Sequence, residues 1–233
     1  MKGNMLIMDN RIGINLSDFY NNDTLNIFCD ASIIGKTGNF TGCYGVVAVV
    51  KDDIIDSCCR IASQTTNNNS EVKGLRAAIS MANKWKNHFK VINIFSDSQI
   101  SVFGLRDYIY RWRFNTNDNK LYGTSGSPVA NQSIFIECHY MMKELQSITN
   151  TCIRIFHQSG HVGNDYNSIK EASVIFNRSN NIVGNIDLNF IRYISTYNNY
   201  VDNLSRSTLR RSNRKITYCD PIYFEAKGKI NKF

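Results

Sequence analysis

The order in which strand-like and helix-like patterns follow one another constrains the fold of this chain more than any other feature. Residues 25–62 hold three runs of alternating apolar or β-branched residues separated by short polar turns, which predicts a three-stranded antiparallel meander. Helical and strand-like patterns then follow in turn over residues 70–88, 91–95, 100–113, 131–147 and 152–156. This order predicts an α/β or α+β sheet whose later strands are joined by right-handed parallel crossovers.

The length and composition indicate a globular chain with its own hydrophobic core. It has 233 residues, of which 42% are hydrophobic and 20% charged, so neither disorder nor a fibrous repeat is expected. The longest uninterrupted apolar run covers residues 46–50, far below the roughly 20 residues of a transmembrane helix. No signal-peptide segment follows the N-terminus, and the seven cysteines form no C-x-x-C pair, which is typical of a reducing compartment. We therefore expect a cytoplasmic protein without a membrane partner.

We expect one domain with an extension at each end. Residues 1–24 form a polar N-terminal extension that would pack on the domain through Ile14 or Phe19. Residues 25–206 form the domain, because no internal repeat or Pro/Gly-rich linker divides them. Residues 207–233 form a basic C-terminal tail.

The net charge of +8 is concentrated at the C-terminal end. Residues 206–233 hold eight basic and two acidic residues, a charge of +6, whereas the remaining 205 residues carry only +2. Such a segment is typical either of a solvated surface or of a contact with a polyanion. We expect the tail to act as an auxiliary clamp on phosphate groups.

Four carboxylates lie where strand and helix boundaries are expected. Asp30 and Asp97 each end an apolar strand, and Glu71 and Asp202 are expected in the first turns of two helices. Each has an ordinary interpretation, a turn residue for the strand ends and a favourable helix-dipole contact for the other two. If folding brings the four together, their charges repel unless cations bridge them. A cluster of oxygen ligands suits Mg²⁺ or Mn²⁺.

Seven short motifs surround these carboxylates in a fixed order along residues 25–206. They are Asp30-Ala31-Ser32, Gly42-Cys43-Tyr44-Gly45, TTNNNSE at residues 65–71, Ser96-Asp97-Ser98-Gln99, Pro128-Val129-Ala130-Asn131, Gly160-His161-Val162-Gly163 and NYVDNLSR at residues 199–206. In this order they resemble the type I ribonuclease H family, with its D-x-S, T-T-N-N-x-x-E, G-H-x-G and N-x-x-D-x-L-A-R signatures. The resemblance covers most of the chain.

The resemblance implies an α/β fold of the RNase H kind, with a five-stranded mixed sheet and helices on both faces. Strands 1, 2 and 3 would form the antiparallel meander, and strands 1, 4 and 5 would be parallel. It also implies an endoribonuclease that hydrolyses the RNA strand of RNA/DNA hybrids and leaves 5′-phosphate and 3′-hydroxyl ends.

The same resemblance implies a set of catalytic residues. Asp30, Glu71, Asp97 and Asp202 would be metal ligands that hold two Mg²⁺ ions, with Mn²⁺ as the alternative, for two-metal catalysis. His161 would be the mobile residue for proton transfer or product release. Without its flanking glycines, His161 would be interpreted as an ordinary loop histidine.

By resemblance, six further residues would bind the substrate. Ser32, Asn67, Asn68 and Gln99 would read the minor groove and the RNA 2′-hydroxyls, and Thr66 and Asn131 would bind a phosphate of the DNA strand. The alternative for Thr66 and Asn131 is helix capping.

Residues 110–113 and the long polar loop that follows them to Pro128 occupy the place of the family's basic handle. Arg111 and Arg113 alternate with Tyr110 and Trp112, although residues 106–122 hold only four basic residues against two acidic ones. The alternative for Trp112 is a side chain packed in the core.

An insertion of roughly residues 164–198 separates His161 from Asp202. Because long segments beside a catalytic edge are often functional, we expect it to form a lid or a further substrate or partner contact. His157 and His161 do not predict a zinc site, since Gly160 interrupts any helix between them and no second ligand pair is present.

Two other functions compete with the nuclease hypothesis. One is a nuclease-dead module that binds RNA/DNA hybrids, which the presence of all four carboxylates disfavours. The other is a resolvase- or integrase-type nuclease of the same fold. We expect the protein to be a monomer.

Overall fold

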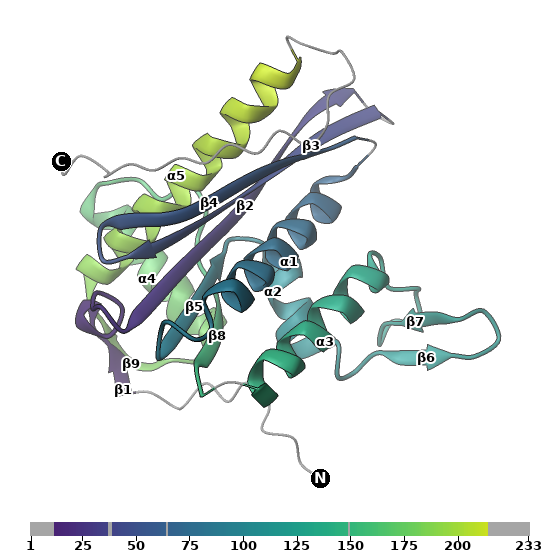
Figure 1. Cartoon of the computed structure of the whole chain (residues 1–233), viewed down its shortest axis with the longest axis horizontal. Coiled ribbons are helices and arrows are strands. Elements are labelled where there is room, and N and C mark those ends of the chain that lie inside the picture. The colour runs from purple at the N-terminus through teal and green to yellow at the C-terminus, as the bar shows by residue number, and fades with distance from the viewer. Residues whose placement is uncertain (1–11, 37–38, 64, 149, 214–233) are drawn as a thin grey trace.

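Five strands form one mixed sheet at the centre of the structure (Figure 1), a computed structural model that describes residues 12–36, 39–63, 65–148 and 150–213. They are β2 (Thr24–Lys36), β3 (Asn39–Val50), β4 (Asp53–Ala62), β5 (Val91–Ser96) and β8 (Cys152–His157). Their order across the sheet is β4-β3-β2-β5-β8. Because β3 is antiparallel to β2 and β4 while β2, β5 and β8 are parallel, the predicted sheet is confirmed.

Helices cover both faces of this sheet, as predicted. They are α1 (Asn67–Trp85), α2 (Gln99–Phe103), α3 (Gln132–Ile148), α4 (Tyr166–Asn180) and α5 (Leu188–Asn213). Successive strand residues face opposite sides, so Leu25, Ile27 and Cys29 of β2 lie in the core under α1, α2 and α3. Phe28 lies in the second core, with α4 and α5. The result is a three-layer arrangement of helices, sheet and helices.

The N-terminal segment packs on the second core. β1 (Ile12–Ile14) pairs in parallel with β9 (Val183–Ile186), and a short turn, η1 (Leu16–Asp18), follows it. Ile14 and Phe19 are 1% and 0% exposed, so both residues named in the sequence analysis are buried. The ring of Phe19 contacts Phe95, Phe156 and Phe190. Residues 1–11 of the expected extension lie outside the described part of the chain.

The segment expected as an insertion supplies core structure. Ile169, Ala172 and Phe176 of α4 are buried, and Phe176 stacks on Phe156 of β8. β9 forms the small sheet with β1. The segment cannot move away from the sheet without exposing this apolar surface to water. The structure therefore argues against the expected lid.

Gly42 lies in a strand where the chain packs closely against a helix. β2 continues to Lys36 and β3 begins at Asn39, so Gly42 lies inside a strand. A Cβ there would come within 2.2 Å of the Ser70 hydroxyl on α1. The close approach of helix and strand, and not a turn, therefore requires this glycine.

The helix and loop expected over residues 100–128 also differ from the structure. α2 passes into a single π-helical turn, η2 (Gly104–Tyr108). The expected loop then contains a hairpin of β6 (Arg113–Asn115) and β7 (Lys120–Tyr122). This hairpin projects away from the sheet beside α3 (Figure 1).

α5 begins well before Asp202, which was expected in the first turn of its helix. Its apolar positions recur at helical spacing and face the second core; they include Phe190, Ile191, Ile194, Tyr197 and Val201. Asp202 therefore lies in the interior of α5 and Glu71 just after the first turn of α1. The helix-dipole interpretation of these two carboxylates is wrong, because that effect is confined to the terminal turns.

The basic tail expected over residues 207–233 begins inside α5. Leu209 is 3% exposed and packs with Cys43 and Cys59. Residues 214–233 lie outside the described part of the chain, so the expected clamp can be assessed only over residues 207–213.

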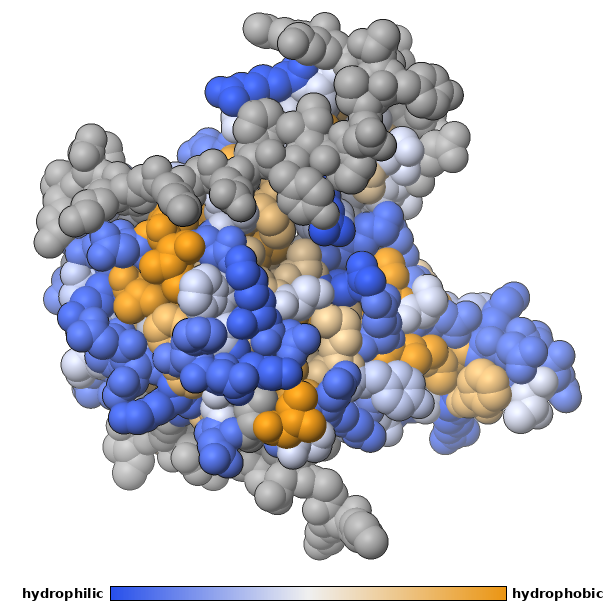
Figure 2. Space-filling model, in the orientation of Figure 1, coloured by the Kyte–Doolittle hydropathy of each residue, from blue (hydrophilic) through white to orange (hydrophobic). Residues whose placement is uncertain are grey.

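The face of the molecule shown in Figure 2 is mainly hydrophilic, with hydrophobic patches separated by polar residues. Among the described helices, none combines the length and the apolar character needed to cross a membrane. The six cysteines of the described residues are free thiols.

Candidate active site

Asp30 and Asp97 are neighbours because they directly follow paired residues of two adjacent parallel strands. β2 and β5 pair in parallel, with Cys29 opposite Ser96. Asp30 directly follows Cys29 in the sequence, and Asp97 directly follows Ser96. Parallel strands bring their carboxyl ends to the same edge of a sheet. Asp97 follows the end of β5, as predicted, but Asp30 lies inside β2, which continues to Lys36, so the prediction that Asp30 ends a strand is wrong. The strand register still places the two residues side by side.

Glu71 and Asp202 reach the same place from opposite faces of the sheet, Glu71 from α1 and Asp202 from α5. All four carboxylates line one cleft of about 560 Å³. The other residues that line it are Ala31, Ser32, Ile33, Ile34, Asn67, His161, Arg206, Leu209 and Arg210. Folding thus gathers residues separated by up to 172 positions, from Asp30 to Asp202, around one cavity.

Asp97 is held by a pair of buried amides that the sequence analysis missed. Asn198 of α5 donates from Nδ2 to Asp97 Oδ2 at 3.2 Å, and Gln158 donates from Nε2 to Asn198 Oδ1 at 2.7 Å. The two amides are 2% and 1% exposed. A Cβ on Gly160 would lie 2.4 Å from the same carboxylate oxygen, so glycine leaves room for Asp97. The one sequence signal for Asn198 is its position four residues before Asp202, which places both on one helix face.

Glu71 and Asp202 are each fixed by hydrogen bonds from nearby side chains. The Ser98 hydroxyl donates to Glu71 Oε2 at 2.5 Å, and the Asn67 amide donates to Glu71 Oε1. Arg206 Nε lies 2.7 Å from Asp202 Oδ1, one helical turn along α5. Arg206 is therefore the counter-ion of Asp202, a role that the family motif alone did not suggest.

The cleft concentrates negative charge in a poorly solvated place. Burial, with the charges of Asp97, Asp202 and Glu71, raises the pKa of Asp30 to about 8, although the backbone N–H of Ala31 acts in the opposite direction. Burial also raises the pKa of Asp97, and the hydrogen bond from Asn198 offsets part of that effect. Repulsion between buried carboxylates favours protonation of at least one of them unless a cation is present.

This charge distribution fits a hard divalent cation. The cleft offers carboxylate oxygens, the ligands that Mg²⁺ and Mn²⁺ prefer. Across the residues that the structure describes, no group of three or more His, Cys, Asp or Glu side chains is arranged so that it could hold a metal ion. The four carboxylates surround an open cleft. The raised pKa of Asp30, caused by burial and by the charges of the other three carboxylates, is the observation that fits a cation there.

His161 lies beside this cleft on the loop after β8. Its backbone φ is +52°, a conformation that non-glycine residues rarely adopt, and its side chain is 68% exposed. Nδ1 lies 3.9 Å from Asp202 Oδ2, and Nε2 lies 3.4 Å from Arg206 Nη2. An exposed imidazole in this position can exchange protons with water.

The residues predicted to bind substrate separate into two groups. Ser32 and Asn67 line the cleft. Asn68 and Gln99 lie on exposed surface at the starts of α1 and α2, outside that lining.

Thr66 and Asn131 also lie outside the lining of the cleft, next to each other. Thr66 is the N-cap of α1 and accepts a hydrogen bond from the Asn69 backbone N–H at 3.2 Å. The Asn69 side chain donates to Asn131 Oδ1 at 2.8 Å. Thr66 therefore caps the helix, the alternative interpretation given above, and this contact does not exclude a phosphate nearby.

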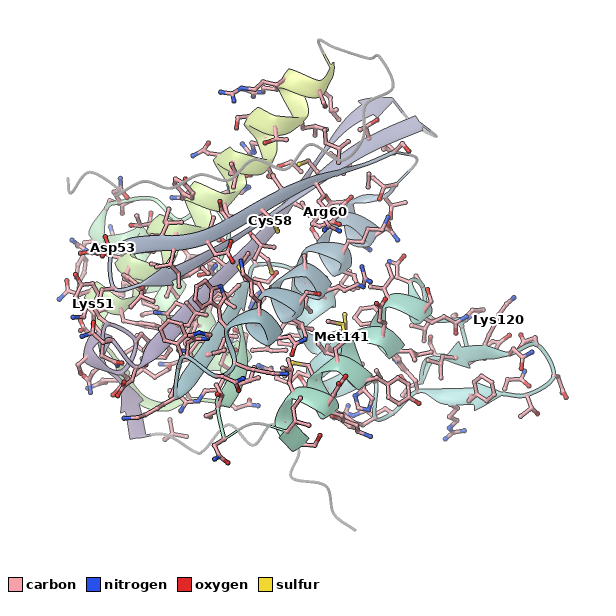
Figure 3. The ribbon with its side chains drawn as sticks, viewed as in Figure 1. Lys51, Asp53, Cys58, Arg60, Lys120 and Met141 are labelled. Atoms are coloured by element: carbon pink, nitrogen blue, oxygen red, sulfur yellow. The ribbon has the colours of Figure 1, made fainter. Side chains whose placement is uncertain are left out.

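The handle-like segment presents fewer cations than its sequence suggests. Arg106 is buried and donates to Asn180 Oδ1 and the Ser179 carbonyl of α4. Trp112 is partly buried against Phe135 of α3, as in the core alternative. Lys120 lies on the projecting hairpin, well away from Arg60 and Cys58 of β4 (Figure 3). Arg111 and Arg113 line a separate pocket of about 350 Å³ at this hairpin.

Comparisons with known proteins agree with this geometry. A family model described as RNase H matches residues 22–172. The ribonuclease HI of Haemophilus influenzae is 32% identical over 145 residues, which cover 62% of this chain and 83% of the relative. The ribonuclease H of Actinobacillus succinogenes is 34% identical over 112 residues, which cover 48% of this chain and 66% of the relative.

A solved structure shares the fold. The foamy viral protease-reverse transcriptase in complex with an RNA/DNA hybrid has a TM-score of 0.50 at 15% identity, over 75% of this chain and 22% of that chain. The family match ends within α4, so Asp202 lies beyond it and joins the cleft through the fold of α5.

Proposed function

This chain belongs to the ribonuclease H family, and on that premise we propose that it hydrolyses the RNA strand of RNA/DNA hybrids in its four-carboxylate cleft. The observation that carries the proposal is the convergence of Asp30, Glu71, Asp97 and Asp202 on one cavity. The relatives named ribonuclease H support the reaction class.

The proposed cofactor is Mg²⁺, with two ions bound by the four carboxylates and Mn²⁺ as a substitute. When bound, such ions activate a water molecule and stabilise the leaving 3′ oxygen, which gives 5′-phosphate and 3′-hydroxyl ends. Asp30 and Asp97 would hold the ions from the sheet edge, and Glu71 and Asp202 from the two helices. His161 would hold and release a proton at the open side of the cleft.

Substrate selection is proposed to begin inside the cleft. Ser32 and Asn67 line it, and a hydroxyl and an amide can hydrogen bond to the RNA 2′-hydroxyl, which distinguishes RNA from DNA. Asn68 and Gln99 would extend these contacts, and Thr66 and Asn131 would bind a DNA phosphate. The monomeric state and the cytoplasmic location stay predictions from the sequence.

A panel of nucleic acids tests the proposed reaction. Labelled RNA/DNA hybrid, duplex RNA, duplex DNA and a four-way junction are incubated with the full chain in Mg²⁺ and in EDTA. We expect cleavage of the RNA strand of the hybrid alone, and only with Mg²⁺. Hybrid that is bound but never cut in Mg²⁺ or Mn²⁺ would indicate the nuclease-dead module, and a cut junction would indicate the resolvase-type enzyme.

Cation binding should release a proton and strengthen with pH. Since the pKa of Asp30 is raised to about 8, this carboxyl is protonated at neutral pH without a cation, and the cation must displace that proton. We expect the Mg²⁺ affinity to rise about ten-fold per pH unit below that pKa and to level off above it.

Titration calorimetry in two buffers of different ionisation enthalpy measures the proton release directly. Asp30→Asn, which lacks the titrating group, is the control and should release no proton there. Equal Mg²⁺ affinity at low and high pH, with no buffer dependence of the heat, would contradict the expected linkage.

A further inference from the structure

The catalytic cleft continues beyond the four carboxylates along α5. Ser32, Ile33 and Ile34 of β2 form one side of this continuation, and Arg206, Leu209 and Arg210 of α5 form the other. It exists because β2 extends six residues past Asp30 to Lys36 and α5 extends eleven past Asp202 to Asn213. The lining of the cleft thus includes residues of β2 and α5 beyond the carboxylates, and we call this part of the cleft the track.

Two arginines follow Asp202 along the wall of this track. Arg206 and Arg210 come four and eight residues after Asp202, so the three side chains lie along nearly the same face of the helix. At 1.5 Å per residue, Arg210 is about 12 Å from Asp202 along the helix axis. That length corresponds to about three to four nucleotides of a strand that advances 3.4 Å per nucleotide along the duplex axis.

The two arginines differ in what they already bind. Arg206 is paired with Asp202 at 2.7 Å, so its charge is committed to the carboxylate. Arg210 is exposed, and no hydrogen bond or ion pair joins it to another residue of the described chain. Its neighbour Leu209 is buried with Cys43 and Cys59, which fixes this turn of α5 against the sheet. Arg210 is thus an uncommitted cation on a turn of α5 that packs against the sheet, on the track that leads from the carboxylates.

We propose that Arg210 binds a backbone phosphate of the substrate strand that leaves the cleft along α5, about three to four nucleotides from the reactive phosphate. The proposal rests on the proposed function, because it requires a hybrid in the cleft. A guanidinium suits phosphate through paired hydrogen bonds. The ligand is the phosphodiester group, which both strands of a hybrid carry.

The test measures the salt dependence of hybrid binding. Arg210→Gln and Arg192→Gln are compared in an Asp97→Asn background, so that the fluorescent hybrid is bound but not cut. Arg192 is an exposed arginine of the same helix that does not line the cleft, and its loss changes the net charge equally. One lost phosphate contact should lower the slope of log K against log salt by about 0.9. The affinity of the Arg210→Gln variant for hybrid should be about eight-fold lower than that of its Asp97→Asn parent at 0.1 M salt, and about three-fold lower at 0.3 M.

Neutral methylphosphonates identify the strand. They are placed two to four nucleotides from the cleavage site, either in the DNA strand or in the RNA strand. In only one of the two strands should they abolish the difference in hybrid affinity between the Asp97→Asn protein with and without Arg210→Gln. A slope for Arg210→Gln equal to that for Arg192→Gln would overturn the inference, even while the wild-type chain cleaves hybrid and the proposed function stands. If the wild-type chain neither binds nor cleaves hybrid, the proposed function and this inference both fail.

Discussion

Asp97→Asn is expected to abolish cleavage of an RNA/DNA hybrid while the hybrid stays bound. The amide has nearly the shape of the carboxylate, so the space beside Gly160 stays filled and Asn198 still lies next to the side chain. What is lost is the negative charge that a cation would bind. Residues that merely orient a metal ligand contribute 10- to 100-fold to activity, so loss of the ligand itself should lower the rate by more than about 100-fold.

The rate of hybrid cleavage, the affinity for hybrid and the unfolding midpoint are measured together. Because the pKa of Asp97 is raised in the folded protein, its charged form costs stability above its unfolded pKa. The amide should therefore leave the unfolding midpoint unchanged or raise it, which separates loss of activity from loss of structure.

Asp23→Asn is the matched control for this substitution. Asp23 makes an exposed pair with Lys90 just before β2 begins, seven residues before Asp30 in the sequence. The Asp23→Asn variant should cleave hybrid at the wild-type rate. Full activity of Asp97→Asn itself would refute the proposed roles of the four carboxylates.

The proximity of Asp30 and Asp97 could be predicted from sequence because local patterns determine it. Each residue ends a short apolar run, and parallel strands place such ends at one edge. Glu71 and Asp202 could be placed on helices by the same means. Their convergence depends on α1 and α5 packing on opposite faces of the sheet, which local patterns do not contain.

The length of α5 could not be predicted for a physical reason. Residues 186–199 mix apolar residues with Asn, Thr and Ser, which have modest helix propensity and also favour caps and turns. The helix is stabilised there by tertiary burial of residues such as Phe190 and Ile194. Asn198 was missed for the same reason, since its approach to Asp97 exists only once this part of the chain is helical.

Phe176→Ala is expected to lower the free energy of unfolding by about 3–5 kcal/mol, the usual cost of removing a fully buried phenylalanine side chain. Phe176 is 1% exposed, and its ring centroid lies 5.7 Å from that of Phe156 and 5.3 Å from that of Phe190. The loss would leave a cavity between α4, β8 and α5. This follows from the finding that residues 164–198 contribute to the second core.

Urea unfolding of the full chain measures this effect, and Val174→Ala is its control. Val174 lies on the same helix but is 53% exposed, so its truncation should change the free energy of unfolding by less than about 0.5 kcal/mol. A lid would behave in the opposite way, because truncations in a lid alter KM and kcat and leave global unfolding nearly unchanged. If Phe176→Ala unfolds at the wild-type urea concentration and changes only the kinetics of hybrid cleavage, α4 belongs to a moving element and not to the core.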